Sequence, residues 1–108
     1  MNLREIAHSR TGDKGDTANI SVIAFNPQQD FALLLRELTT QRVLAELTPA
    51  LTHFQATLVT VERYELAQLG ALNFVVKGIL KGGVTRSLSL DAHGKSLGSL
   101  LLNMQLAP

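Results

Sequence analysis

The most regular hydrophobic pattern in the chain predicts a helix that begins at residue 27. Asn26-Pro27 is a strong helix start, because Asn caps free backbone N–H groups and Pro suits the first helical position. Large apolar residues then recur at the spacing of one helical face, at Phe31, Leu34, Leu35 and Leu38. The pattern therefore predicts an amphipathic helix whose apolar face packs against a core.

A second helical stripe follows almost immediately. Thr39-Thr40 supplies another possible cap, and Val43, Leu44 and Leu47 continue the apolar spacing. Pro49 disfavours helical geometry at Thr48, so we expect the helix to end there. The two stripes form either one kinked helix or two short helices.

Other segments alternate with the period of a strand. We expect a weak strand at residues 2–8 and a clearer one at 18–25, separated by a polar loop at 9–17. Residues 56–64 are rich in β-branched side chains, and residues 84–90 alternate cleanly between apolar and polar. Such half-polar alternation is typical of antiparallel sheets that have one face in water.

Two segments fit both the helical and the strand spacing of apolar residues. Residues 70–80 match a helical stripe that Gly82-Gly83 would end, although Phe74-Val75-Val76 also suits a strand; the helix is favoured slightly. Residues 96–106 also fit both, and Ser96 as a cap favours the helix. Together the elements predict an α+β two-layer sandwich, with a mainly antiparallel sheet and helices on one face.

Composition limits the kinds of protein this can be. A chain of 108 residues with 45% hydrophobic content fits one folded domain over residues 1–108. A net charge of +1 with 5% aromatic residues argues against nucleic-acid binding, and the absence of cysteine excludes disulfides and metal–thiolate sites. No apolar run of about 18 residues exists, so we expect a cytoplasmic protein without a membrane span or signal peptide.

The densest polar chemistry lies in residues 8–19, between two expected strands. Arg10 or Lys14 would hold a carboxylate, thioester or phosphate, while Asp13, Asp16 or His8 moves a proton. Alternatively the two aspartates would hold Mg²⁺. Gly12 and Gly15 would let the loop expose consecutive backbone N–H groups. The opposing view is a long loop tied by its own salt bridges.

A glycine pair marks a second candidate site. Gly82-Gly83 precedes a strand and would let a ligand or another backbone come close, and Arg86 interrupts an apolar face. The alternative is a helix stop followed by an Arg whose stem covers apolar surface. The candidate ligand-binding residues are thus Ser9, Arg10, Thr11, Gly12, Lys14, Gly15, Asn19, Gly82, Gly83 and Arg86.

The string His-Ser-Arg-Thr-Gly-Asp-Lys-Gly-Asp-Thr-Ala-Asn-Ile at 8–20 resembles the signature of the AtuA-like, acyclic terpene utilisation family. The strings at 71–75 and 82–95 resemble its later segments. The resemblance implies the small C-terminal domain of those proteins, described as ferredoxin-like, and a link to catabolism of branched or terpenoid acyl-CoA compounds. It assigns no reaction to this domain.

Three functions follow as hypotheses. The first is an accessory subunit or domain that binds a large AtuA-like partner and uses residues 8–19 to bind a ligand or that partner. The second is an independent hydratase or lyase acting on acyl-CoA thioesters through Asp13, Asp16 or His8. The third is a structural module for homo-oligomerisation, which would add stability to a small cysteine-free core. A CoA thioester and Mg²⁺ are the ligands considered.

Overall fold

The computed structural model describes residues 1–14, 17–48, 59–78 and 94–107, and for residues 13, 14, 94–96 and 99 it describes the backbone alone. The strands are β1 (Ala7–Lys14), β2 (Thr17–Ala24), β3 (Thr60–Leu66) and β4 (Ala71–Lys77). The helices are α1 (Pro27–Glu37), α2 (Thr40–Leu47) and α5 (Gly94–Leu102), with short 3-10 turns η1 (Leu3–Glu5) and η3 (Ala67–Leu69). The strands form one four-stranded antiparallel sheet in the order β1-β2-β4-β3.

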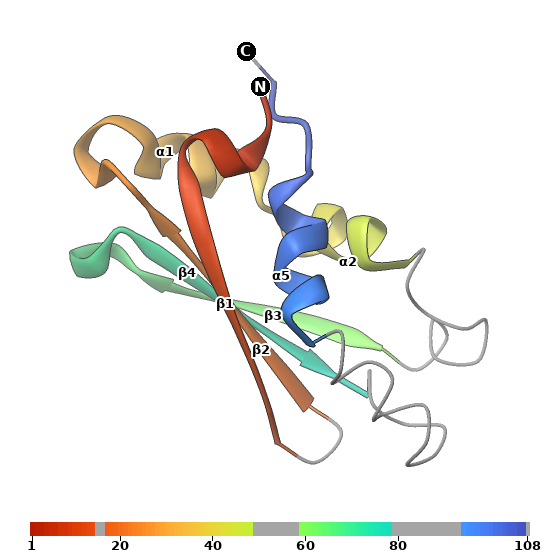
Figure 1. The fold of residues 1–108 in the computed structure, drawn as a ribbon. Coiled ribbons are helices and arrows are strands. Elements are labelled where there is room, and N and C mark those ends of the chain that lie inside the picture. The colour runs from red at the N-terminus through yellow and green to blue at the C-terminus, as the bar shows by residue number, and fades with distance from the viewer. Residues whose placement is uncertain (15–16, 49–58, 79–93, 108) are drawn as a thin grey trace.

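The three helices lie on one side of this sheet (Figure 1). Helix α5 packs on β1 and β2, α1 packs on β2 and β4, and α2 packs on β3. The predicted α+β two-layer sandwich, with an antiparallel sheet and helices on one face, is therefore confirmed. Among the described residues, no helix combines the length and apolar character needed to cross a membrane.

The hydrophobic core fills the space between the sheet and the helices. Alternate residues of the two central strands supply the sheet's part of it: Ala18, Ile20, Val22 and Ala24 of β2, and Leu72, Phe74 and Val76 of β4. The helices supply Leu34, Leu38, Val43, Leu47, Leu97 and Leu101. We call the side of the sheet that carries these residues the covered face and the other side the open face.

The predicted helix starts are confirmed, and the two apolar stripes are two separate helices. The side-chain oxygen of Asn26 accepts from the backbone N–H of Gln29 at 3.3 Å, and the hydroxyl of Thr39 accepts from that of Arg42 at 3.2 Å. At the end of α1, Arg63 of β3 donates to the carbonyls of Leu35 and Leu38 at 2.9 and 3.0 Å. These bonds satisfy carbonyls that the helix itself leaves free.

The strand expected at 2–8 is wrong over Leu3–Glu5, and the loop expected at 9–17 is wrong over 9–14 and at Thr17; residues 15–16 lie outside the described residues. Residues Leu3–Glu5 form a 3-10 turn, whose start is held because the backbone N–H of Asn2 donates to the Glu5 carboxylate at 2.6 Å. The polar segment from Ala7 to Lys14 is instead a strand, paired in register with all of β2. Its polar side chains fit a strand because one face of the sheet is open to solvent.

The helix favoured at 70–80 is also wrong, because Ala71–Lys77 forms the central strand β4. Central pairing with β2 and β3 on both sides outweighs the helical spacing, which short apolar runs share with buried strands. Residues Thr60–Leu66 form the strand expected at 56–64. Helix α5 confirms a helix in the tail, but it runs from Gly94 to Leu102, so Ser96 lies inside it and is not its cap, and the helix ends before residue 106. The strand expected at 84–90 and the turn after it lie outside the described residues.

The two ends of the chain lie side by side (Figure 1). The backbone N–H of Leu3 donates to the carbonyl of Met104 at 2.9 Å, and that of Leu106 donates to Met1 at 2.8 Å. Further along, the backbone N–H of Ala107 donates to the Glu37 carboxylate at 2.8 Å. This bond is the main reason that the pKa of Glu37 lies below its usual range; Arg36 and Arg42 add to the effect.

Candidate functional site

Strand alternation divides the most informative sequence motif between the two faces of the sheet. Ser9 and Thr11 pair with Val22 and Ile20, which belong to the covered face. His8, Arg10 and Gly12 therefore belong to the open face, because successive residues of a strand point to opposite sides. Residues that would act together in a loop are thus separated by the thickness of the sheet.

The inward half of the motif packs under helix α5. A Cβ placed at Gly98 would overlap the Ser9 hydroxyl and lie 2.9 Å from Thr11 Oγ1. Helix α5 therefore approaches β1 as closely as it does because position 98 has no side chain. Thr11 Oγ1 is buried and has no hydrogen-bond partner within the part of the chain that the structure describes. Ser9 and Thr11 consequently line a helix–strand contact.

The outward half of the motif joins a polar row that crosses all four strands. In this row Arg10 lies opposite Ser21, Ser21 opposite Asn73, and Asn73 opposite Tyr64. The Ser21 hydroxyl donates to Asn73 Oδ1 at 3.2 Å, which leaves the two N–H groups of the Asn73 amide to bind an acceptor. Within the described residues, the Arg10 guanidinium has neither a hydrogen bond nor an ion pair.

The next row on the open face is largely apolar. It runs across the strands through His8, Ile23, Ala71 and Leu66. His8 stacks on Phe25 with ring centroids 5.4 Å apart and an angle of 17° between the planes. Exposed fractions are 61% for Phe25, 50% for Tyr64, 43% for Leu66 and 65% for Leu69. This end of the open face therefore presents large apolar side chains to solvent, and we call it the apolar end.

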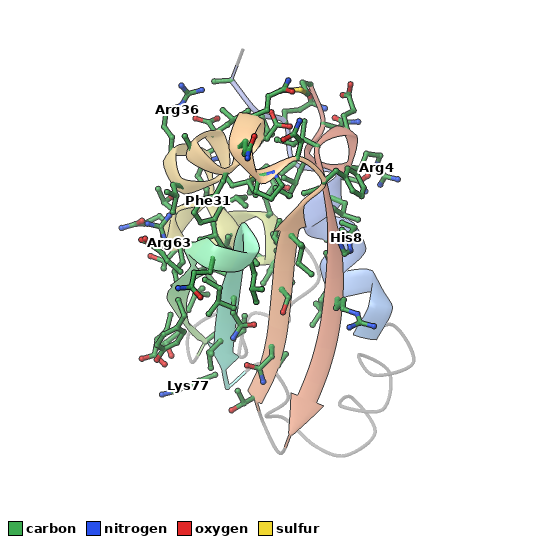
Figure 2. The ribbon with its side chains drawn as sticks, turned by 90° about the vertical axis from the view of Figure 1, so that its left-hand side faces the viewer. Arg4, His8, Phe31, Arg36, Arg63 and Lys77 are labelled. Carbon is green, nitrogen blue, oxygen red and sulfur yellow. The ribbon has the colours of Figure 1, made fainter. Side chains whose placement is uncertain are left out.

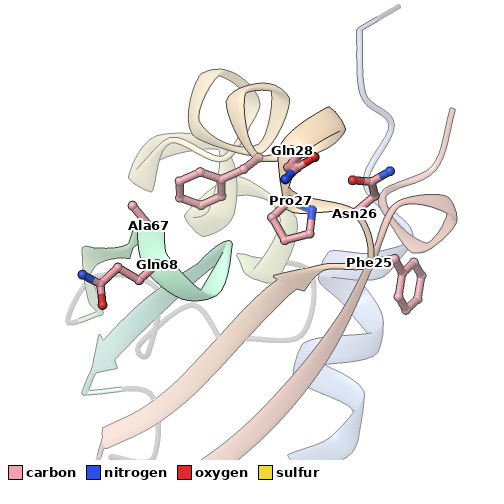
Figure 3. A pocket seen from close by; sticks show the side chains of 7 residues that line it. Phe25, Asn26, Pro27, Gln28, Ala67 and Gln68 are labelled. Carbon is pink, nitrogen blue, oxygen red and sulfur yellow. The ribbon is translucent and has the colours of Figure 1, made fainter.

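The turn η3 is fixed in place at the apolar end by a glycine. Gly70 has φ 63°, a left-handed conformation that favours glycine, and a Cβ there would overlap Pro27 at the start of α1. The close approach forms a groove of about 560 Å³, in which Ala67 and Gln68 face Pro27 and Gln28 (Figure 3). Leu69 is consequently held outward by a rigid turn.

A second hollow lies on the open face itself and includes a motif residue. It has a volume of about 340 Å³ and is lined by Arg10, Ser21, Ile23, Leu66, Leu69 and Ala71. One charged and one hydroxyl side chain therefore meet four apolar ones. Sequence reasoning found only Arg10 of this set, because the other residues come from β2, β3, β4 and η3 and become neighbours through strand pairing.

The far end of the open face carries an ion pair. Lys77 Nζ of β4 lies 2.9 Å from Glu62 Oε1 of β3, and the hydrogen bond that Lys77 donates to this carboxylate raises the pKa of Lys77. Figure 2 shows His8 along β1 and Lys77 at the far end of β4, with Arg4 and Arg36 near η1 and α1. Both partners of the ion pair are substantially exposed, so it adds little to stability.

The structure places the remaining candidates as follows. Gly12 is an ordinary strand residue that pairs with Asn19 and does not have a positive φ, so the special glycine backbone conformation expected there does not occur. A Cβ at Gly12 would have no non-neighbouring heavy atom within 4 Å. Asp13 and Lys14 pair by backbone with Ala18 and Thr17. The other candidates lie outside the described residues: Gly15, Asp16, Gly82, Gly83 and Arg86.

Metal binding and proton transfer stay predictions for this region. Within the described residues, no three His, Cys, Asp or Glu side chains come together in a group that could hold a metal ion. The Mg²⁺ hypothesis concerns Asp13 and Asp16, whose side chains are not among those described. The same holds for their expected role as acid–base groups, while His8 lies exposed beside Phe25.

Comparison with known families agrees with this architecture. The model of the AtuA ferredoxin-like domain matches residues 1–107. The chain belongs to this family. The predicted resemblance and fold class are therefore confirmed over nearly the whole sequence. Searches of curated proteins and of solved structures find no match.

Proposed function

We propose that this AtuA ferredoxin-like domain is an accessory subunit or domain of an AtuA-type system, and that its open face binds a large AtuA-like partner. The observation that carries the proposal is the apolar end of the open face, where Phe25, Leu66 and Leu69 are exposed close to His8 and Arg10. Contiguous exposed apolar surface that borders polar residues is typical of protein interaction sites.

The shape of this surface favours a protein partner. Residues of η3 line both depressions: Ala67 and Gln68 border the groove at Pro27, and Leu69 borders the hollow at Arg10. An exposed apolar side chain next to hollows that a partner can fill suits the central contacts of an interface. The place of this complex in terpenoid or branched acyl-CoA catabolism rests on the family resemblance.

The test measures binding of the chain to a large AtuA-like chain that lacks its own copy of this domain. Leu69→Glu adds a charge at the apolar end, and Gln41→Glu adds the same charge on the exposed surface of α2. We expect calorimetry to show a micromolar complex that Leu69→Glu weakens at least about tenfold and Gln41→Glu leaves within about twofold.

The outcomes separate the hypotheses. Absence of a complex at high micromolar concentrations contradicts the accessory role. Equal binding by both variants keeps the role but excludes the apolar end as the interface. Sedimentation of the chain alone addresses homo-oligomerisation, because a dimer built on the open face would dissociate in Leu69→Glu.

A further inference from the structure

We propose that the hollow at Arg10 binds a small aliphatic carboxylate, with its head on the polar row and its chain on the apolar row. The hollow's lining contains a cation and a hydroxyl at one side and Ile23, Leu66, Leu69 and Ala71 at the other. A volume of about 340 Å³ lies at the lower end of the range typical of small-molecule sites. Neither the family match nor the motif assigns this site.

The head group is indicated by the Arg10 guanidinium. Among the described residues it has no partner, and its planar fork matches the two oxygens of a carboxylate. Ser21 stands directly opposite Arg10 in the register and lines the same hollow. Because the Ser21 hydroxyl donates to Asn73 Oδ1, the donor that this lining offers to a head group is Arg10.

The tail is indicated by the spacing of the two rows. Residues two apart on a strand lie about 7 Å apart along the same face, which is the separation of Arg10 from the row of Ile23 and Ala71. A chain of a few methylene groups covers this distance and ends against Leu66 and Leu69. A bare inorganic anion would leave these apolar side chains in water.

Gly12 leaves the surface beside Arg10 without a side chain. It neighbours Arg10 on the open face of an edge strand, where a Cβ would meet no non-neighbouring atom within 4 Å. A glycine inside a strand lowers stability, and it often marks a place that another molecule approaches. The same opening would admit the ligand before a protein partner covers the face.

The experiment is an amide NMR titration of the chain alone, so that its result does not depend on any partner. The probes are hexanoate, acetate, which lacks the tail, and hexanamide, which lacks the charge. We expect hexanoate to shift the amides of β1, β2 and η3 around the hollow, with a dissociation constant of about 1–10 mM. Acetate and hexanamide should bind at least about tenfold more weakly.

Matched variants locate the head group. Arg10→Gln should weaken hexanoate binding at least about fivefold, whereas Arg36→Gln on exposed α1 should leave it unchanged. Both side chains are exposed, so we expect neither substitution to disturb the core. The amide spectra verify that each variant stays folded. Equal binding of hexanamide, shifts confined to the helices, or an unchanged affinity in Arg10→Gln would overturn the proposal. If the chain binds hexanoate but forms no complex with the large AtuA-like chain, only the accessory role is overturned.

Discussion

The two faces of the sheet use the same strands for different purposes. The covered face is closed by three helices and carries fully buried side chains such as Ile20, Leu72 and Phe74. The open face carries Arg10, Asn73 and Tyr64 and leaves apolar side chains in water at one end. The difference shows that alternate residues of one motif on β1 belong to the packed face and to the solvent-exposed face of the sheet.

The largest contrast between the faces should appear on β4. Phe74→Ala removes a fully buried ring from the covered face and should lower the free energy of unfolding by about 3–5 kcal/mol. Its neighbour Val75 lies on the open face, so Val75→Ala should cost about 1 kcal/mol or less. Urea denaturation measures both. Similar losses would mean that the open face is covered in solution, for example by a second copy.

The contact between α5 and β1 should show the next largest effect. Gly98→Ala forces a methyl group into Ser9 and should lower the free energy of unfolding by about 1–2 kcal/mol, although Ala favours helices. Ser9→Ala removes the closest obstacle, and the Ser9 Cβ then lies 3.5 Å away, an ordinary contact. The double variant should therefore recover part of the loss. Strictly additive effects in this cycle would contradict the close packing.

We expect the smallest changes in the free energy of unfolding when one hydroxyl is removed from each face. Thr11→Val replaces a buried oxygen that has no partner among the described residues with a methyl group, and it should raise the free energy of unfolding by about 0.5–1 kcal/mol. On the open face, Ser21→Ala breaks the bond to Asn73 and should lower it by a similar amount. Thermal denaturation measures both changes in stability, which should have opposite signs. A destabilised Thr11→Val would show that this hydroxyl has a partner in solution.

Local signals in the sequence were sufficient for the helices and for the class of fold. Asn26 and Thr39 act within three residues of themselves, so the sequence alone shows where α1 and α2 begin. The motif at 8–20 identified the family for the same reason, because it is continuous in the chain.

The errors concern elements that depend on distant partners. The polar segment of β1 becomes a strand only because β2 pairs with it, and β4 is a strand because β2 and β3 enclose it. The hollow at Arg10 was missed for the same physical reason: Leu69 and Ile23 are far apart in sequence and meet through sheet order. Exposed leucines beside a turn glycine were the one available signal, at Leu66, Leu69 and Gly70.

The paired chain ends have a consequence for how such a unit is attached to other proteins. Met1 and Leu106 are joined by a backbone hydrogen bond, and Asn2 and Gln105 form an isolated bridge. A linker of a few residues would connect them, so a circularly permuted chain with new ends in an exposed turn should keep the same fold. The two ends thus form one attachment point. The whole domain can be inserted into a surface loop of a host protein while its open face stays accessible.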